Sequence, residues 1–299
     1  MPSPTVIVIG GPTASGKTAL AARVAQELAT EVIGADARQF YRELPIGTAQ
    51  PTEEERLGVK HHFIGHLGIQ EDMSAAAYAE AALPVLQELL ERNGTVVVSG
   101  GSGLYIDALL FELDPLPPAD AALRERLQAL HREHGVEALA EELDRLDPEA
   151  GAAIDRRNPH RLVRAIELVT LTGKPLSALR TGKRPREGFA VRWIALDLPR
   201  EELYARIDTR VDAMMVAGLE AEARAVFPHR GLNSLRTVGY SELFEHFEGR
   251  CTRNEAVARI KQHTRNYAKR QLTWLRRDAH WRWVDPRRQE EVLRAAAGS

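Results

Sequence analysis

A glycine-rich segment near the start of the chain has the residues and spacing of a phosphate-binding loop. Its sequence, GPTASGKT at residues 11–18, fits the pattern G-x-x-x-x-G-K-[ST]. In this pattern, backbone N–H groups and the start of the next helix surround phosphate oxygens with partial positive charge. The lysine adds a full charge, and the last hydroxyl can coordinate Mg²⁺. We expect the whole segment to form a phosphate or nucleotide site: Gly11, Pro12, Thr13, Ala14, Ser15, Gly16, Lys17 and Thr18.

The elements around this loop predict a parallel sheet. Short β-branched runs at 5–10, 31–35 and 95–99 are typical of buried strands. Helical patterns at 17–29 and 75–91 separate them. Strands that alternate with helices favour an α/β fold with parallel strands.

One carboxylate stands where it can reach the loop. Asp36 follows the second predicted strand, and the carboxyl ends of parallel strands line the ligand crevice of open α/β sheets. We therefore expect Asp36 to point toward the loop, although an aspartate here can also simply cap a turn. The third predicted strand ends in SGGS, without the acid that usually holds Mg²⁺ in phosphoryl-transfer enzymes. N-K-x-D and D-x-x-G motifs are also missing, which argues against a GTPase.

Two other polar groupings invite a chemical interpretation. The segment GGSGLY at 100–105 resembles a nucleophile elbow, but Leu104 stands where the elbow needs glycine. We expect Ser102 to be a hydrogen-bonding group and not a nucleophile. His61, His62 and His66 lack the spacing of a zinc site, so we expect structural or polar roles for them.

A change of pattern inside the chain predicts two domains. The sequence DPLPP interrupts the chain after Leu113, and residues 119–181 then have a helical pattern throughout. Strand character returns at 188–198, followed by helical patterns from 200 to 275. We therefore predict an α/β phosphate-loop core with a parallel sheet, formed by residues 1–114 and 188–299, and an inserted all-helical domain at 115–187.

The total charge hides an uneven distribution. The chain of 299 residues has 40 basic and 42 acidic side chains, a formal net charge of −2. Residues 156–187 nevertheless contain nine basic and two acidic residues, and residues 250–288 contain twelve and three. In the second stretch, Tyr267 and Trp274 stand among the basic residues. This pattern is typical either of a solvated helix face or of a nucleic-acid backbone contact.

The remaining composition suits a soluble intracellular protein. Cys251 is the only cysteine, which excludes a disulfide within one chain and a cysteine-based zinc site. The N-terminus has no signal-peptide pattern, and no apolar run approaches a membrane span. We expect a cytoplasmic monomer without membrane contact.

Eight segments, in order along the chain, resemble the bacterial-type tRNA dimethylallyltransferases, also called tRNA isopentenyltransferases. These segments are GPTASGKT (11–18), DARQ (36–39), IGTAQP (46–51), HHF (61–63), GGSGLY (100–105), NPHRLVRAIE (158–167), TVGYSEL (237–243) and YAKRQLTWLR (267–276). The chain departs from the family pattern at Ala37, Ser102 and His160, where the family more often has Ser, Thr and Gln.

The resemblance implies a reaction. Such enzymes transfer the dimethylallyl group from dimethylallyl diphosphate to N6 of the adenosine immediately 3′ of the anticodon (tRNA position 37). It implies that Asp36 is the general base, and that Lys17, Ser102 and Arg124 are further catalytic residues. The 11–18 loop would bind the leaving diphosphate, with Mg²⁺ on Thr18 and Ser15. We expect Arg206 and Arg210, four residues apart on one helix face, to be further diphosphate ligands.

The resemblance also implies a tRNA anticodon stem-loop as partner, with the target base extruded from its stack. The family segments that contact tRNA correspond here to Asp36, Ala37, Arg38, Gln39, Ser102, Arg124, His160, Arg161, Leu162, Val163, Arg164, Arg236, Gly239 and Tyr240. Three alternatives stay open: a small-molecule kinase, an adenylate isopentenyltransferase, and a non-catalytic RNA-binding protein that has kept the loop.

Overall fold

The computed structural model describes residues 3–298, which form two compact units. The core unit comprises Met1–Leu110 and Arg186–Ser299, and the insertion unit comprises Phe111–Pro185. The sequence analysis places the same two divisions at 114/115 and 187/188. Each unit is described separately below.

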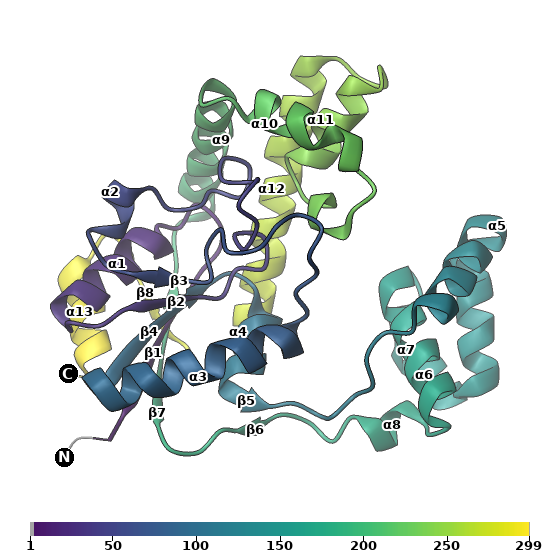
Figure 1. The fold of residues 1–299 in the computed structure, drawn as a ribbon, viewed down its shortest axis with the longest axis horizontal. Helices are drawn as coiled ribbons and strands as arrows, with labels where there is room; N and C mark the ends of the chain where they lie inside the picture. Colours follow the sequence, from purple (N-terminus) through teal and green to yellow (C-terminus); the bar gives the residue numbers. More distant parts are fainter. Residues whose placement is uncertain (1–2, 299) are drawn as a thin grey trace. The chain divides into compact units, whose positions relative to one another are not determined.

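The core unit contains a sheet of six parallel strands, which confirms the predicted α/β class (Figure 1). Their order across the sheet is β3 (His61–His62), β2 (Val32–Gly34), β4 (Thr95–Gly100), β1 (Thr5–Gly10), β7 (Ala190–Leu196) and β8 (Arg282–Val284). The four predicted strands correspond to β1, β2, β4 and β7. The sequence does not predict β3 and β8, because strands of two and three residues are too short to show a periodic pattern.

Strand β1 lies in the middle of the sheet, and every one of its residues is buried. Its apolar side chains alternate between the two faces of the sheet. Ile7 and Ile9 pack in one cluster with residues of α1 (Lys17–Glu27) and α13 (Gln289–Ala297). A strand buried on both faces needs a continuous apolar run, which is the pattern that the sequence has here.

The strand register brings three chain turns to one edge of the sheet. Gly10 at the end of β1 pairs with Gly100 at the end of β4, and Gly34 of β2 pairs with Ser99. Because these strands are parallel and end in register, the segments that follow them emerge side by side. The segments are the 11–18 loop, the turn that carries Asp36, and the turn that carries Ser102.

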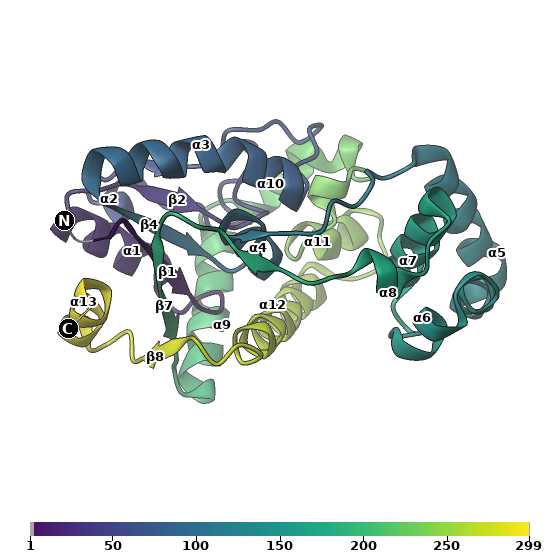
Figure 2. The same ribbon diagram turned by 90° about the horizontal axis from the view of Figure 1, so that it is seen from below.

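Helices complete the core unit around this edge. Helices α3 (Ala75–Asn93) and α4 (Gly103–Leu110) pack together beside the sheet (Figure 2). Helices α9 (Arg200–Val216), α10 (Leu219–Val226), α11 (Tyr240–Phe247) and α12 (Arg253–Leu275) form a second group with its own buried cluster. The short helix α2 (Glu53–Arg56) begins with a capping box at Thr52.

The insertion unit is mainly helical, but it is not all-helical as predicted. It contains α5 (Ala121–Leu146), α6 (Pro148–Ala153), α7 (Pro159–Thr172) and α8 (Leu176–Leu179). An antiparallel pair of two-residue strands, β5 (Phe111–Glu112) and β6 (Arg184–Pro185), joins its first and last segments. The sequence does not predict this pair, because β6 contains a proline and charged residues instead of a strand pattern.

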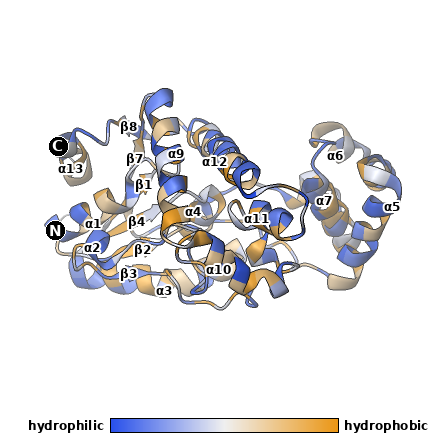
Figure 3. Ribbon diagram, turned by 90° about the horizontal axis from the view of Figure 1, so that it is seen from above, coloured by the Kyte–Doolittle hydropathy of each residue, from blue (hydrophilic) through white to orange (hydrophobic). Residues whose placement is uncertain are grey.

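The helices of the insertion unit enclose a separate apolar core. One side of α7 is hydrophobic, as Figure 3 shows, and it packs against α5. The backbone of α5 breaks at Gly135, where φ is 80°. None of the helices in residues 3–298 has the length and apolar character that a membrane span requires.

Candidate functional site

The 11–18 loop connects β1 to α1 and turns tightly at two positions. Ala14 and Gly16 have φ values of 65° and 90°, in the left-handed region. Lys17 Nζ donates a hydrogen bond to the carbonyl of Pro12 at 3.3 Å. Burial lowers the pKa of Lys17 to about 8, which the charge of Asp36 partly opposes and that of Arg210 reinforces. The lysine is therefore desolvated and placed beside a carboxylate.

A buried hydroxyl lies inside the same loop. Ser15 is 1% exposed, and its Oγ has no hydrogen-bond partner within residues 3–298. A Cβ on Gly11 would lie 2.7 Å from this oxygen, so only glycine can pack this closely against the hydroxyl. A buried polar atom without a partner is costly, and a bound phosphate oxygen or metal ion would satisfy it. Thr18 lines the loop cavity described below, whereas Ser15 lines a separate, smaller hollow. Coordination of Mg²⁺ by both hydroxyls stays a prediction.

The described part of the chain has no cluster of three His, Cys, Asp or Glu side chains that could hold a metal. The three histidines have structural contacts instead. His62 Nε2 lies 2.6 Å from Glu31 Oε2, His61 Nδ1 lies 2.9 Å from the carbonyl of Val59, and the His66 ring packs edge-on against Phe63.

Two cavities meet at the carboxyl edge of the sheet. The loop cavity, of about 670 Å³, includes Gly16, Lys17 and Thr18 in its lining. The α12 cavity, of about 580 Å³, is lined by Tyr267 and Arg270 of α12 among others. The two share one wall, formed by Thr13, Asp36, Thr48, Ala49, Arg210 and Met214. Asp36 therefore faces both spaces.

The turn after β2 holds Asp36 in place through its neighbours. Asp36 Oδ1 accepts the N–H of Arg38 at 3.2 Å, and the Ala37 N–H donates to Ser102 Oγ at 3.1 Å. Tyr267 lies against the same group and interacts with the Ser102 hydroxyl. Burial, reinforced by the charge of Asp36, raises the pKa of the Tyr267 phenol, so the phenol stays protonated.

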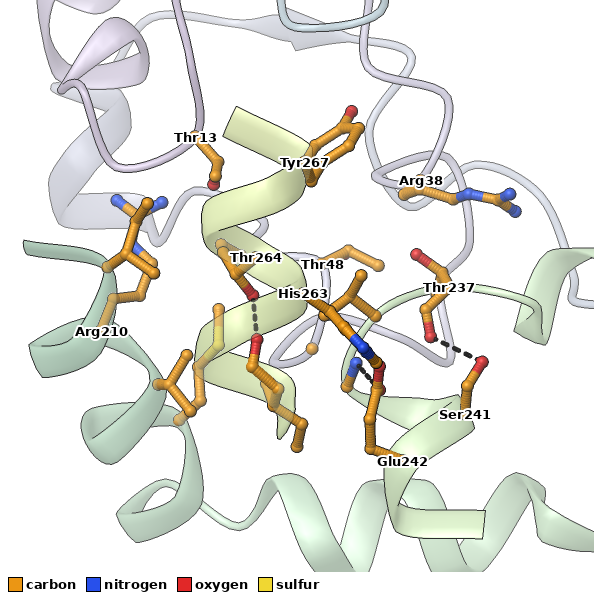
Figure 4. Close-up of a pocket in the computed structure, with 18 of the residues that line it drawn as sticks. Thr13, Arg38, Thr48, Arg210, Thr237, Ser241, Glu242, His263, Thr264 and Tyr267 are labelled. Carbon is orange, nitrogen blue, oxygen red and sulfur yellow. Dashed lines mark hydrogen bonds and ion pairs between the residues drawn. The ribbon is translucent and has the colours of Figure 1, made fainter. Parts of the chain in front are cut away.

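Figure 4 shows the α12 cavity with Arg38 and Thr237 on the side opposite Arg210. The Arg38 guanidinium donates to the carbonyls of Asn233 and Arg236, at 3.1 and 3.4 Å. These bonds tie the Asp36 turn to the segment before α11. Arg236 is exposed, and with Gly239 it lines the cavity.

Two further residues of the core unit that are predicted to contact RNA lie in different surroundings. Gln39 donates from Nε2 to the carbonyls of Thr48 and Ala49, at 3.2 and 2.7 Å, and lies in the loop cavity. Tyr240 is fully buried, and its phenol donates to Glu222 Oε1 at 2.6 Å. The structure buries the Tyr240 side chain, and the predicted tRNA contact at this position stays a prediction.

The two predicted arginines of α9 also differ. Arg210 lies on the shared wall of both cavities, and burial lowers its pKa. Arg206 lines neither cavity but a smaller hollow beside Ser15 and Gly16, and it pairs with Glu202 at 2.8 Å.

In the insertion unit, Glu167 forms ion pairs with two arginines that are predicted to contact tRNA. Arg124 Nε and an N–H of Arg164 lie 3.0 and 2.5 Å from its carboxylate, which is fully buried. His160 and Arg161 are exposed, whereas Val163 is half-buried. Leu162 is completely buried in the helical core, and its predicted tRNA contact stays a prediction. The roles of Arg124 and Arg164 toward substrate stay predictions.

The basic stretch of α12 divides into paired and unpaired halves. Its earlier cations form ion pairs with acids of α9, α10 and α11: Arg253 with Glu220, Arg259 with Glu245, Lys261 with Asp212 and Arg265 with Asp208. The later cations have no ion pair within residues 3–298; they are Lys269 and Arg270 of α12, and Arg276 and Arg277 directly after it. Only the later half offers free charge to an anion.

Several residues that the fold brings here have no individual site role predicted from the sequence, although Tyr267 and Arg270 belong to the stretch that can contact a nucleic-acid backbone. The residues are Gly47, Thr48, Glu222, Tyr267, Arg270 and Gln271. Tyr267 and Gln271 lie in a recognised segment, but no pattern indicates which of its side chains face the loops. Glu222 has no local sequence signal, since its partners are at Ile46 and Gly47.

The fold and this site define an α/β enzyme with a loop site at the carboxyl edge of a parallel sheet. Comparison with known proteins then gives the family. Residues 39–278 match the family model described as IPP transferase, and the chain belongs to this family. Members of the family transfer prenyl groups, so the protein is a transferase.

Individual relatives agree over nearly the whole chain. A tRNA dimethylallyltransferase of Cytophaga hutchinsonii is 47% identical over 281 residues, covering 94% of this chain and 92% of the relative. The crystal structure of the tRNA isopentenylpyrophosphate transferase of Bacillus halodurans has a TM-score of 0.72 and 36% identity, covering 99% and 96% of the two chains. The enzyme of Staphylococcus epidermidis has a TM-score of 0.70 and 32% identity, covering 99% and 98%.

Proposed function

We propose that this protein transfers the dimethylallyl group from dimethylallyl diphosphate to N6 of the adenosine immediately 3′ of a tRNA anticodon. The products are N6-isopentenyladenosine and diphosphate. One observation carries the proposal: Asp36 lies on the wall between a cavity that contains Lys17 and a cavity that contains Arg270. A donor diphosphate and an acceptor base can thus approach one carboxylate from two sides.

The loop cavity suits the diphosphate. Lys17 and Arg210 supply positive charge there, and the loop N–H groups and the start of α1 add fixed partial charges. As the allylic C–O bond breaks, its electron pair leaves with the diphosphate. Charge on the leaving oxygen grows in the transition state, so these groups stabilise the transition state more than the ground state. Mg²⁺ held by Thr18 and Ser15 would neutralise part of the diphosphate charge.

The acceptor needs help because the lone pair of an adenine N6 amine is delocalised into the ring. In our proposal Asp36 accepts one N6 proton while the new N6–C bond forms. Assistance by a general base is typically worth about 10²- to 10⁴-fold in rate. Tyr267 and Ser102 support the turn that follows β2, and this turn keeps the Asp36 carboxylate in its place on the shared wall.

The α12 cavity suits a single extruded nucleotide with its backbone outside. Its volume of about 580 Å³ lies in the range of small-molecule sites. Arg38, Arg236 and Arg270 lie on its lining and can meet RNA phosphates. A base still stacked in the anticodon loop could not enter, so extrusion must precede transfer.

The test combines an acceptor series with one isosteric variant. The protein is incubated with Mg²⁺, labelled dimethylallyl diphosphate, and an anticodon stem-loop, AMP or no acceptor. We expect label in the stem-loop alone. Label only in AMP would overturn the tRNA assignment. In a parallel incubation with ATP and a small acceptor, ATP turnover would indicate a kinase. Asp36→Asn should lower kcat about 10²- to 10⁴-fold while diphosphate affinity stays within about twofold. Asp72→Asn, an exposed aspartate outside both cavities, is the matched control.

A further inference from the structure

The side chain of Gln271 joins two loops that are far apart in the sequence. Its Oε1 accepts the backbone N–H of Thr13 at 2.8 Å, and its Nε2 donates to the carbonyl of Gly101 at 3.0 Å. Gln271 is 5% exposed, so both bonds are sheltered from water. A backbone N–H can only donate and a carbonyl can only accept, so these two partners fix the orientation of the amide.

The contact requires glycine in the second loop. A Cβ on Gly101 would collide with Nε2 of Gln271, and a Cβ on Gly103 would collide with the indole of Trp274. Between them, Ser102 interacts with Tyr267. Three consecutive residues of the 101–103 turn therefore each meet one residue of α12.

The three α12 residues occupy one helix face. Tyr267, Gln271 and Trp274 are spaced at i, i+4 and i+7, which places them in a row along the helix. The glycines of the segment GGSGLY leave room for the large side chains of this row.

The position of Asp36 gives the contact its importance. A Cβ on Gly101 would lie 3.6 Å from Asp36 Oδ2, so the 101–103 turn borders the carboxylate directly. Thr13, at the other end of the Gln271 bridge, lines both cavities. The bridge thus joins the 11–18 loop to the turn that carries Ser102 and borders Asp36.

We propose that Gln271 is a positioning residue that sets the spacing between the 11–18 loop and the 101–103 turn, and thereby the distance from leaving group to base. The proposal rests on the function proposed above. Gln271 touches neither substrate in this scheme; it acts through Thr13 and Gly101. Misplacement of reacting groups by about 1 Å can cost about 10²-fold in rate.

The principal test is Gln271→Met, which keeps the length of the side chain and removes both hydrogen bonds. We expect kcat for prenyl transfer to fall roughly 10- to 100-fold, with KM for the stem-loop within about twofold. The control is Gln262→Met, which changes an exposed glutamine on the same helix. A Gln271→Met protein that folds and keeps the wild-type kcat would overturn the proposal.

Gln271→Glu gives a second readout that a purely structural role would not change. A protonated glutamic acid can donate to Gly101 and accept from Thr13, whereas the carboxylate can only accept. Burial raises the pKa of a carboxyl group. The kcat of Gln271→Glu relative to wild type should therefore rise as pH falls from about 8.5 to about 6; a constant ratio would contradict the proposal.

Amide hydrogen exchange separates this proposal from the proposed function. In Gln271→Met, exchange at Thr13 should be faster than in wild type, whatever reaction the protein performs. Unchanged protection at Thr13 would overturn the bridge. If the wild-type protein shows no prenyl transfer while Thr13 exchanges faster in Gln271→Met, the proposed function is wrong and the bridge still stands.

Discussion

Tyr240 donates its phenolic hydrogen to Oε1 of Glu222, over 2.6 Å, and the same carboxylate accepts the backbone N–H groups of Ile46 and Gly47 at 2.9 and 2.8 Å. Burial, reinforced by the charge of Glu222, raises the pKa of this phenol. The pair fixes the turn that leads to Thr48, on the wall shared by both cavities. Tyr240 thus stabilises the wall of the site through Glu222, without lining either cavity.

This relationship predicts the behaviour of Tyr240→Phe. Loss of one hydrogen bond to a charged acceptor should lower the free energy of unfolding by about 1.5–3 kcal/mol. Affinity for the anticodon stem-loop should stay within about twofold, because the buried ring does not reach RNA. Denaturant unfolding and filter binding measure the two effects. A large loss of RNA affinity in a stably folded variant would show that Tyr240 contacts RNA after all.

Gly47→Ala tests the same turn from the other side. The new methyl carbon would lie 2.5 Å from the Tyr240 hydroxyl oxygen, so the 46–49 turn must move. We expect kcat/KM for prenyl transfer to fall at least about tenfold, by displacement of the shared wall. Gly249→Ala, in a turn outside both cavities, is the control, although its φ of 75° adds local strain. Wild-type kinetics for Gly47→Ala would mean that the turn adapts.

The lowered pKa of Lys17 predicts a pH-dependent diphosphate affinity. Below its pKa of about 8 the side chain is charged and attracts the anion; above it, the free protein has lost that charge. Affinity for inorganic diphosphate should therefore decline as pH rises from about 8 to 9.5, and binding there should take up a proton. Calorimetry in buffers of different ionisation enthalpy measures the uptake. Lys17→Met should bind weakly and without this pH dependence; equal pH profiles for both proteins would exclude Lys17 as the cause.

The division of α12 into paired and unpaired cations predicts unequal effects on RNA binding. Arg270→Gln should weaken stem-loop binding and reduce the slope of log affinity against log salt by about one. Arg253→Gln removes a cation that Glu220 already neutralises, so its slope should match wild type. Titrations at several salt concentrations compare them. Identical slopes for Arg270→Gln and wild type would place the RNA phosphates elsewhere.

The buried carboxylate of the insertion unit predicts a stability effect. Glu167→Ala would leave Arg124 and Arg164 without their shared partner and open a gap in the core of this unit. The cost should be about 1–3 kcal/mol, because both arginines remain partly exposed to water after the change. Denaturant unfolding of the full chain, followed by a probe within residues 111–185, measures the loss. A loss below about 1 kcal/mol would mean that solvent already screens these charges.

The sequence by itself determined the class of fold, the 11–18 loop and the placement of Asp36 after β2. These features depend on local patterns. A buried parallel strand needs a continuous apolar run, a phosphate-type loop needs glycine at a left-handed position, and Asp36 follows the strand by two residues. Such features can be predicted without knowledge of contacts between distant residues.

The tertiary structure alone decided which side chains of the recognised segments face the site. The segment at 237–243 contains Gly239, which lines a cavity, and Tyr240, which points into the core. Arg206 and Arg210 share a helix face by spacing, yet only Arg210 reaches both cavities. Gln271 meets partners 258 and 170 residues away. Burial and hydrogen bonding between distant segments are properties of packing, and no local spacing encodes them.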